Sequence, residues 1–502
     1  MSSLPSDLET SHKEIIRLTR ELEYLKEQLR LTRAKIFGKS SEKHSPAPSA
    51  QVLLFPKPAL TEPAPEPKTE KIEYTRTKHT RVEGKLPEGT RFPEHLPRED
   101  EIVEEGEGEV VFEKISERLA AKPSAFFVKR IIRRVRRTDG SLSCPAVPPA
   151  VIERTTVDVS FLVYLLIAKY MWHLPLYRQE QMLKAQGITI SRDTLIRYVI
   201  SAAGLLKPIY VALGVELFSG DHLFGDETPA LVGKGSRDNK RYSESWFWTF
   251  LGESGCAFYY APTRAFKEVE PLMKSFSGDL QCDGYRVYEM LSRKYPEITL
   301  VGCWAHARRK FVDAEKGGNA PESTEALRYI RALYKVEARI RDSELGLPET
   351  LRLRQRFSKK ILKLFERWLK NKASDPAMLP KSLFGNAVSY ALKRWEALNR
   401  YTDDPKLSID SNAVERQIRS FALGKKNWLL CASEVGAEAS AIIYSLIASC
   451  KLADVDPSEY LTDVLERISD HPDSKVTELI PVNWKVLVQA EKDAAAALPQ
   501  VA

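Results

Sequence analysis

The chain has 502 residues, enough for several domains, and its 43% hydrophobic and 29% charged residues are ordinary for a globular protein. Its 76 lysines and arginines exceed its 68 aspartates and glutamates, and the net charge of +8 favours a polyanionic partner. The polar N-terminus predicts no signal peptide, no uninterrupted apolar run is long enough for a bilayer, and six scattered cysteines suit a reducing cytosol. We therefore expect a cytoplasmic protein with no membrane partner.

Residues 1–43 repeat an apolar position every seven residues. The repeated positions are Leu8, Ile15, Leu22, Leu29 and Ile36, and Leu18 and Leu25 follow two of them by three residues. This spacing is typical of the a and d positions of a coiled coil and predicts a helix that ends at Gly38. Two interpretations stay open: self-association through this seam, or a single amphipathic helix lying on its own protein.

Two further segments separate this helix from the rest of the chain. Residues 44–74 are rich in proline and alanine and are expected to form a disordered linker. Residues 75–148 favour a small β-rich basic module, in which an acidic block at 98–109 precedes a basic block at 129–137. A strand or ribbon with a basic edge would follow DNA phosphates through Lys129, Arg130, Arg133 and Arg134. The alternative is a solvated strand that the acidic block neutralises.

Residues 149–215 have the pattern of a helical module. A helix, a turn at Gly187 and a second helix with Ser191 as its N-cap have the spacing of a helix-turn-helix. In that motif the second helix enters the major groove of DNA, and Arg192 and Arg197 would face it. Simple helical packing would give the same pattern, so both interpretations remain.

Residues 216–440 alternate strands with helices. Strands are expected at 221–232, 245–252, 256–262, 278–284 and near 297–302, with helices at 265–276 and 306–316. Three close strands predict an antiparallel meander, and the later alternation predicts parallel additions to one mixed sheet. Residues 320–400 have a helical pattern throughout and resemble an insertion of helical hairpins. A further helical segment, residues 441–490, closes the chain.

Three acidic residues occupy matching places in this predicted sheet. Asp226 follows the apolar start of the first strand, and Asp283 ends the fourth. Glu415 lies in a helix that starts near Ser411 and is expected to be followed by a basic turn. If the two strands are neighbours and the helix crosses them, the carboxylates converge, and Mg²⁺ ions would compensate their charge. Spacing alone does not separate these acids from their rivals, which are Asp221, Glu227, Asp279, Asp410 and Glu438.

Several longer motifs together favour one family. "GDETP", "LQCDGY", "CWAHARRKF", "SNAVERQIRSFALGKKNWL" and "SEVGAEASAIIYSLIASCKL" resemble the transposases of bacterial insertion-sequence family 66, over roughly residues 150–475. The resemblance implies an α/β, ribonuclease-H-like mixed sheet with a helical insertion. It also implies an Asp-Asp-Glu triad, here Asp226, Asp283 and Glu415, that holds two Mg²⁺ ions, for which Mn²⁺ can substitute. Many members carry a cysteine-based zinc module, but only Cys144 lies between residues 75 and 148, so no zinc is expected.

Other residues are predicted to support this chemistry. Trp304 and His306 would lie beside the catalytic strand, and a structural role is expected for the Cys303 and His306 pair rather than half a zinc site. Contacts with the DNA backbone are expected from Arg308, Arg309, Lys310, Arg416, Arg419, Lys425 and Lys426. A solvated helix face is the alternative for the last four.

The resemblance therefore predicts a nucleoid-associated DNA transposase. It would cut double-stranded DNA at the ends of an insertion sequence, join those ends to target DNA, and act as at least a dimer, with accessory proteins where the element encodes them. One alternative is a catalytically silent DNA-binding protein or repressor of the same descent. Another is a coiled-coil scaffold whose core is purely structural.

Overall fold

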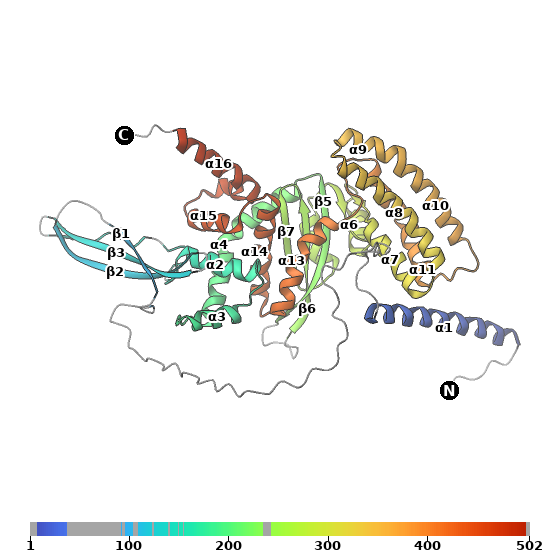
Figure 1. Ribbon diagram of the computed structural model, residues 1–502, viewed down its shortest axis with the longest axis horizontal. Helices are drawn as coiled ribbons and strands as arrows, with labels where there is room; N and C mark the ends of the chain where they lie inside the picture. The colour runs from blue at the N-terminus through green and yellow to red at the C-terminus, as the bar shows by residue number, and fades with distance from the viewer. Residues whose placement is uncertain are drawn as a thin grey trace, which may run out of the picture.

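The computed structural model describes residues 8–37, 92, 96–103, 109–122, 125–138, 141–148, 150–153, 155–233 and 242–497. The protein is elongated, with a β-ribbon at one end, a mixed sheet in the middle and a bundle of helices at the other end (Figure 1). The predicted linker at 44–74 lies outside the described residues.

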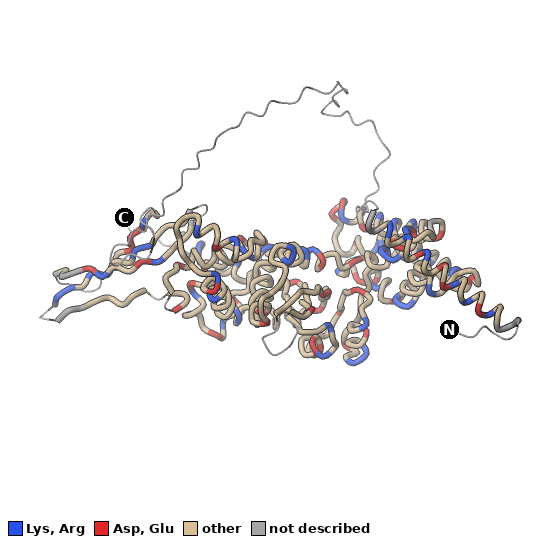
Figure 2. Tube along the Cα trace, turned by 90° about the horizontal axis from the view of Figure 1, so that it is seen from below, with Lys and Arg blue, Asp and Glu red and all other residues tan. Residues whose placement is uncertain are grey.

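The ribbon at one end of the molecule contains the basic block. It consists of β1 (Arg98–Val103), β2 (Glu109–Lys122), β3 (Ala125–Thr138) and β4 (Ser141–Ser143). The order is β1-β3-β2, so the basic strand β3 is an inner strand, and the prediction of a basic edge is wrong. Acids from both neighbouring strands oppose its cations, and both signs of charge lie along the ribbon (Figure 2).

All four predicted DNA contacts on β3 are engaged by other groups of the same module. The guanidinium of Arg130 donates two hydrogen bonds to the Asp100 carboxylate, at 2.6 and 2.7 Å. Arg134 pairs with Glu113 at 3.2 Å, and Lys129 pairs with Glu101 at 2.9 Å. Arg133 donates to the carbonyl of Pro145 at 3.2 Å. These pairs match the alternative interpretation, in which acidic residues of the same module neutralise the basic block.

The central sheet has the predicted mixed topology. Its strands are β5 (His222–Gly233), β6 (Tyr242–Gly252), β7 (Gly255–Ala261), β8 (Gly278–Gln281), β9 (Ile298–Val301) and the short β10 (Leu430–Cys431). The order is β7-β6-β5-β8-β9, with β10 beside β5. The first three strands are antiparallel, whereas β8 and β9 run parallel to β5. The meander and the parallel additions are therefore confirmed, and β5 lies at the point where they meet.

Helices cover both faces of this sheet. One face packs against α5 (Phe266–Met273) and α6 (Arg286–Lys294). The other packs against α2 (Val159–Tyr170), α4 (Arg192–Phe218), α13 (Asn412–Trp428) and α14 (Glu434–Leu452), and α15 (Pro457–Arg467) and α16 (Pro481–Ala497) complete that side. The predicted helix-turn-helix elements are present: α3 (Leu176–Ala185) precedes α4, and the Ser191 hydroxyl accepts from the Thr194 amide at 3.2 Å.

Two helices, α4 and α14, are long and apolar enough to cross a membrane by length and composition alone. Their packing supplies another reason for this composition, because α14 is buried on almost every side between α4 and the sheet. Ser445 and Ser449 of α14 even accept hydrogen bonds from the β7 amides of Phe258 and Cys256, at 2.8 and 2.9 Å. We interpret both helices as parts of the protein core.

The insertion is helical, as predicted. It follows α7 (Trp304–Gly317) and consists of α8 (Ala320–Asp342), α9 (Leu347–Leu353), the π-helical turn η1 (Arg354–Ser358), α10 (Lys359–Ala373), α11 (Leu383–Lys393) and α12 (Trp395–Asn399). The buried Arg354 pairs with Glu337 at 2.7 Å and donates to the carbonyls of Tyr401 and Leu407 at 2.8 and 2.9 Å. Arg354 therefore fixes the segment that leads from the insertion into α13.

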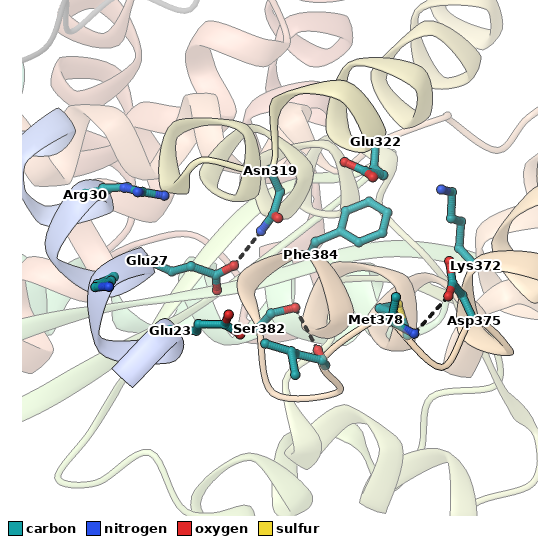
Figure 3. Close-up of a pocket in the computed structure, with 13 residues that line it drawn as sticks. Glu23, Glu27, Arg30, Asn319, Glu322, Lys372, Asp375, Met378, Ser382 and Phe384 are labelled. Carbon is teal, nitrogen blue, oxygen red and sulfur yellow. Dashed lines mark hydrogen bonds between the residues drawn. The ribbon is translucent and has the colours of Figure 1, made fainter. Parts of the chain in front are cut away.

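The N-terminal helix α1 (Leu8–Phe37) lies against this insertion. The Glu27 carboxylate accepts from the Asn319 side chain at 2.6 Å (Figure 3). It also accepts from the amide of Leu383, the first residue of α11, at 3.0 Å. Leu31, one turn further on, is buried. The heptad side chains Ile15, Leu18, Leu22, Leu25 and Leu29 are instead about half exposed. The helix thus packs on its own protein by one face, and the heptad seam is exposed on another face.

Glu27 should therefore control the docking of α1. Glu27→Ala removes an acceptor at the start of α11 and the partner of Asn319, which should cost about 1 kcal/mol. Hydrogen–deuterium exchange should be faster in α1 and at the Leu383 amide. In the control Glu21→Ala, the lost carboxylate pairs, among the residues that the structure describes, with the exposed Arg17 of α1 itself. Exchange in α1 and at the Leu383 amide should therefore not change in this control. Equal exchange in both variants would contradict the docked arrangement.

Candidate active site

Strand register brings Asp226 and Asp283 together. In the parallel pair β5–β8, His222 is opposite Asp279 and Phe224 is opposite Gln281. Two residues beyond Phe224 and Gln281, the same register places Asp226 opposite Asp283, on one face of the sheet. The strand β8 ends at Gln281, and the Asp283 carboxylate then accepts from the Tyr285 amide at 2.7 Å. Asp283 thus stands in the turn between β8 and α6, beside the middle of β5.

The third acid arrives on α13, which packs across the same face of β5. Asp410 holds the start of this helix, because its carboxylate accepts from the Asn412 amide at 3.1 Å and from the Tyr334 hydroxyl at 2.7 Å. The Ser411 amide donates to the sulfur of Cys303, next to the first residue of α7, at 3.3 Å. These contacts fix the first turn of α13, and Glu415 lies in that turn.

Neighbouring carboxylates raise the pKa of Asp226. Burial raises the pKa of Asp226 most, and the neighbouring charges of Glu227, Asp283 and Glu415 raise it further, to about 7. His306 lies beside them, with its Nε2 atom 3.7 Å from Glu415 Oε1, and burial lowers its pKa. Arg309 approaches the other oxygen of Glu415 at 3.6 Å. The site therefore concentrates negative charge that the protein only partly compensates.

This donor set suits a divalent cation. Glu415 Oε1 and His306 Nδ1 are both buried without a hydrogen-bond partner, which leaves polar atoms in need of a ligand. Carboxylate oxygens are the ligands that Mg²⁺ prefers. Within the described part of the chain, no three His, Cys, Asp or Glu side chains are arranged so that they could hold a metal ion as they stand. Binding would therefore require rotation of the carboxylates toward one another.

Glu227, a rival of Asp226 in the sequence, has a different environment. Because side chains alternate along a strand, it faces the opposite side of the sheet. Its carboxylate accepts from Arg264 Nε at 2.8 Å and from the Tyr288 hydroxyl at 2.7 Å. The Arg264 guanidinium in turn lies over the Tyr285 ring, at 3.6 Å from its centroid. Glu227 is thus committed to anchoring β5 against α6, and strand alternation is the sequence signal that separates the two acids.

The remaining predicted residues are the buried Trp304 and a set of basic residues. Trp304 is fully buried in the core of the insertion, where its indole nitrogen donates to the Leu398 carbonyl at 2.7 Å. The others lie on α4, α7 and α13. The exposed ones are Arg192, Arg197, Arg309, Lys310, Arg416, Arg419 and Lys426, and Arg308 is half-buried.

Lys425 and Lys426 correct one sequence prediction. The sequence suggested a basic turn after the glutamate helix, but α13 continues through both lysines to Trp428. The Lys425 ammonium group donates to the Pro229 carbonyl on β5 at 2.7 Å. Lys425 therefore ties the helix to the strand that carries Asp226, while Lys426 faces solvent.

Sequence comparisons agree with this architecture. The sequence model described as "Transposase IS66 family" matches residues 154–439, which span both the sheet and the insertion. The "IS66 C-terminal element" matches residues 445–482, and "Transposase C of IS166 homeodomain" matches residues 24–100. The chain therefore belongs to the IS66 transposase family.

Three relatives come from Sinorhizobium fredii (strain NBRC 101917 / NGR234). Uncharacterized protein y4jD is 30% identical, over 96% of this chain and 97% of its own length. Uncharacterized proteins y4hP and y4qI are each 31% identical, and they cover 74% and 78% of this chain and 71% and 77% of their own lengths. The likeness to y4jD thus includes the ribbon and the N-terminal helix as well as the sheet.

The raised pKa of Asp226 predicts how stability depends on pH in metal-free buffer. The folded protein holds a proton up to about pH 7, whereas an unfolded chain releases it near 3.8, so this stabilisation is full below pH 4 and lost as pH rises through 7. Between pH 5 and pH 8 the loss would be up to about 2.5 kcal/mol. In urea unfolding, Asp226→Asn should show less destabilisation than wild type over this range, and the exposed-site control Asp193→Asn should match wild type. An unchanged pH dependence in Asp226→Asn would contradict the assignment.

Proposed function

We propose that this protein is a metal-dependent DNA transposase that cuts the ends of an insertion sequence and transfers them into target DNA. The observation that carries the proposal is the approach of Asp226, Asp283 and Glu415 from β5, the end of β8 and α13 to one face of the sheet. Membership of the IS66 transposase family supports the same conclusion. The strand order, with an antiparallel meander extended by parallel strands, is the order expected of a ribonuclease-H-like core.

Each residue of the triad has a separate task in this proposal. Asp226 and Asp283 would hold two Mg²⁺ ions, or Mn²⁺ in their place, and Glu415 would hold one of them. Such ions, when bound, activate an attacking oxygen and stabilise the leaving oxygen in phosphoryl transfer. His306, whose Nε2 atom lies 3.7 Å from Glu415 Oε1, would orient that carboxylate. Cys303 and Asp410 act at a distance, because they fix the first turn of the helix that carries Glu415.

Double-stranded DNA would cross the site along the exposed cations of α7 and α13. Arg416, Arg419 and Lys426 are exposed on α13, and no ion pair involves them within the described ranges. Arg308, Arg309 and Lys310 of α7 would hold the backbone from the other side of the carboxylates. Arg192 and Arg197 on the helix-turn-helix would contact an end sequence. The ribbon cations Lys129, Arg130, Arg133 and Arg134 would contribute less, because bonds within the ribbon already engage them.

The free seam of α1 would pair two copies of the chain in the complex, with accessory proteins joining where the element encodes them. Two ends must be held together during transposition, and a coiled coil of two α1 helices would provide that link. Because the docked face of α1 contains Glu27 and the seam lies elsewhere, pairing does not require release from the insertion.

A nicking assay tests the proposal directly. In Mn²⁺ or Mg²⁺, wild type should nick DNA that contains an element end, and Asp283→Asn should reduce the rate about 1000-fold, because a metal ligand supplies several kcal/mol of transition-state stabilisation. Asp279→Asn is the matched control, a carboxylate on the same strand β8 but at the level of His222 rather than Asp226. Its nicking rate should stay close to wild type. Equal nicking rates in all three proteins would show that Asp283 is not part of the catalytic site. DNA binding without nicking by wild type would favour the catalytically silent alternative.

A further inference from the structure

A groove borders the carboxylate site on the side of the insertion. It lies between α7 and α11 and has a volume of about 380 Å³. Its polar lining includes Lys310 and Asp313 from α7, Asn386, Tyr390 and Lys393 from α11, and Arg394. The groove thus joins α7, the helix that carries His306, to α11 of the insertion, and 80 residues of chain separate Lys310 from Tyr390.

The groove has an excess of positive charge. Lys310 and Arg394 lie against the ring of Tyr390, with the Lys310 nitrogen 4.7 Å and the Arg394 guanidinium carbon 4.5 Å from its centroid. Arg394 also pairs with Glu289 at 2.6 Å. Lys310 and Lys393 are both exposed, and neither forms an ion pair with a residue that the structure describes. Two ammonium groups therefore remain available to an anion.

Two residues that line the groove also contact the turn that presents Asp283. Arg394 donates to the carbonyl of Gly284 at 2.8 Å, directly after Asp283. A Cβ atom at Gly284 would lie 2.4 Å from Arg394 Nε and 2.6 Å from the Tyr390 ring, so the insertion packs closely against the turn that presents Asp283. A DNA strand that lies in the groove would therefore pass close to the turn that presents Asp283.

We propose that this groove binds the phosphate backbone of the DNA strand that enters the active site, through Lys310 and Lys393, and this rests on the proposed function. Tyr390 forms the wall between the two helices and keeps the Lys310 ammonium group directed toward the groove. Arg394 positions the turn at Asp283 against the same wall. The insertion would thus act as a DNA-binding element as well as a support for α13.

The salt dependence of DNA binding tests the two lysines. Each phosphate contact contributes about 0.9 to the slope of log K against log salt concentration, so Lys310→Gln with Lys393→Gln should reduce the slope by about 2 and Lys393→Gln alone by about 1. Fluorescence anisotropy with an end-sequence duplex in EDTA measures it. Lys363→Gln, an exposed lysine of α10 outside the groove, should leave the slope unchanged. A wild-type slope in Lys393→Gln would overturn the proposal, even if Lys310→Gln changed it.

Crosslinking tests where the strand lies. Lys393→Cys should form a disulfide with a thiol tethered to a phosphate within a few nucleotides of the cleavage position, and not with one placed a full helical turn away. Lys363→Cys should react with neither. Reaction of Lys393→Cys only with the distant thiol, or with none, would overturn the proposal. Both measurements detect DNA binding and do not depend on cleavage. If wild type fails to nick DNA, the proposed function is contradicted. The groove proposal is still decided by the binding and crosslinking results.

Discussion

The concentration of negative charge at one point of the sheet is the constraint on which the rest of the structure depends. Parallel pairing of β5 and β8 brings two aspartates level with each other, and α13 adds a glutamate from the same face. Burial raises the pKa of Asp226 most, and the charges of Glu227, Asp283 and Glu415 raise it further, to about 7. A protein gains no stability from such an arrangement by itself. The loss of stability from these clustered carboxylates is explained if they bind a cation that acts on a phosphodiester.

Much of the surrounding structure keeps that charge in place. Arg354 fixes the segment before α13, Asp410 and Cys303 hold its first turn, and Lys425 ties its later part to β5. Arg394 reaches from the insertion to the turn at Asp283. The insertion is thus joined to both sides of the site. The same insertion also contacts α1 through Glu27, which connects the helix with the exposed heptad seam to the segments that support the active site.

The sequence predicted the parts of this protein that local pattern controls. Apolar alternation located the strands, and the heptad spacing located α1. Charge pattern alone did not determine the role of the basic strand, because the pairing order β1-β3-β2, which opposes Arg130 to Asp100, is a long-range property. The contacts of Arg394 and Tyr390 with Gly284 were also missed, since about a hundred residues separate them in sequence. The end of α13 was misplaced because glycine and two lysines resemble a turn, although tertiary packing extends the helix to Trp428.

Mn²⁺ binding by electron paramagnetic resonance tests the central claim most directly, because it measures the cation that the three carboxylates are proposed to share. With an end-sequence duplex bound, wild type should take up two Mn²⁺ ions per chain, with the spin coupling of ions about 4 Å apart. Asp226→Asn should lose that coupling while it still binds the duplex. The same coupled pair in Asp226→Asn, or no bound Mn²⁺ in wild type, would contradict the account.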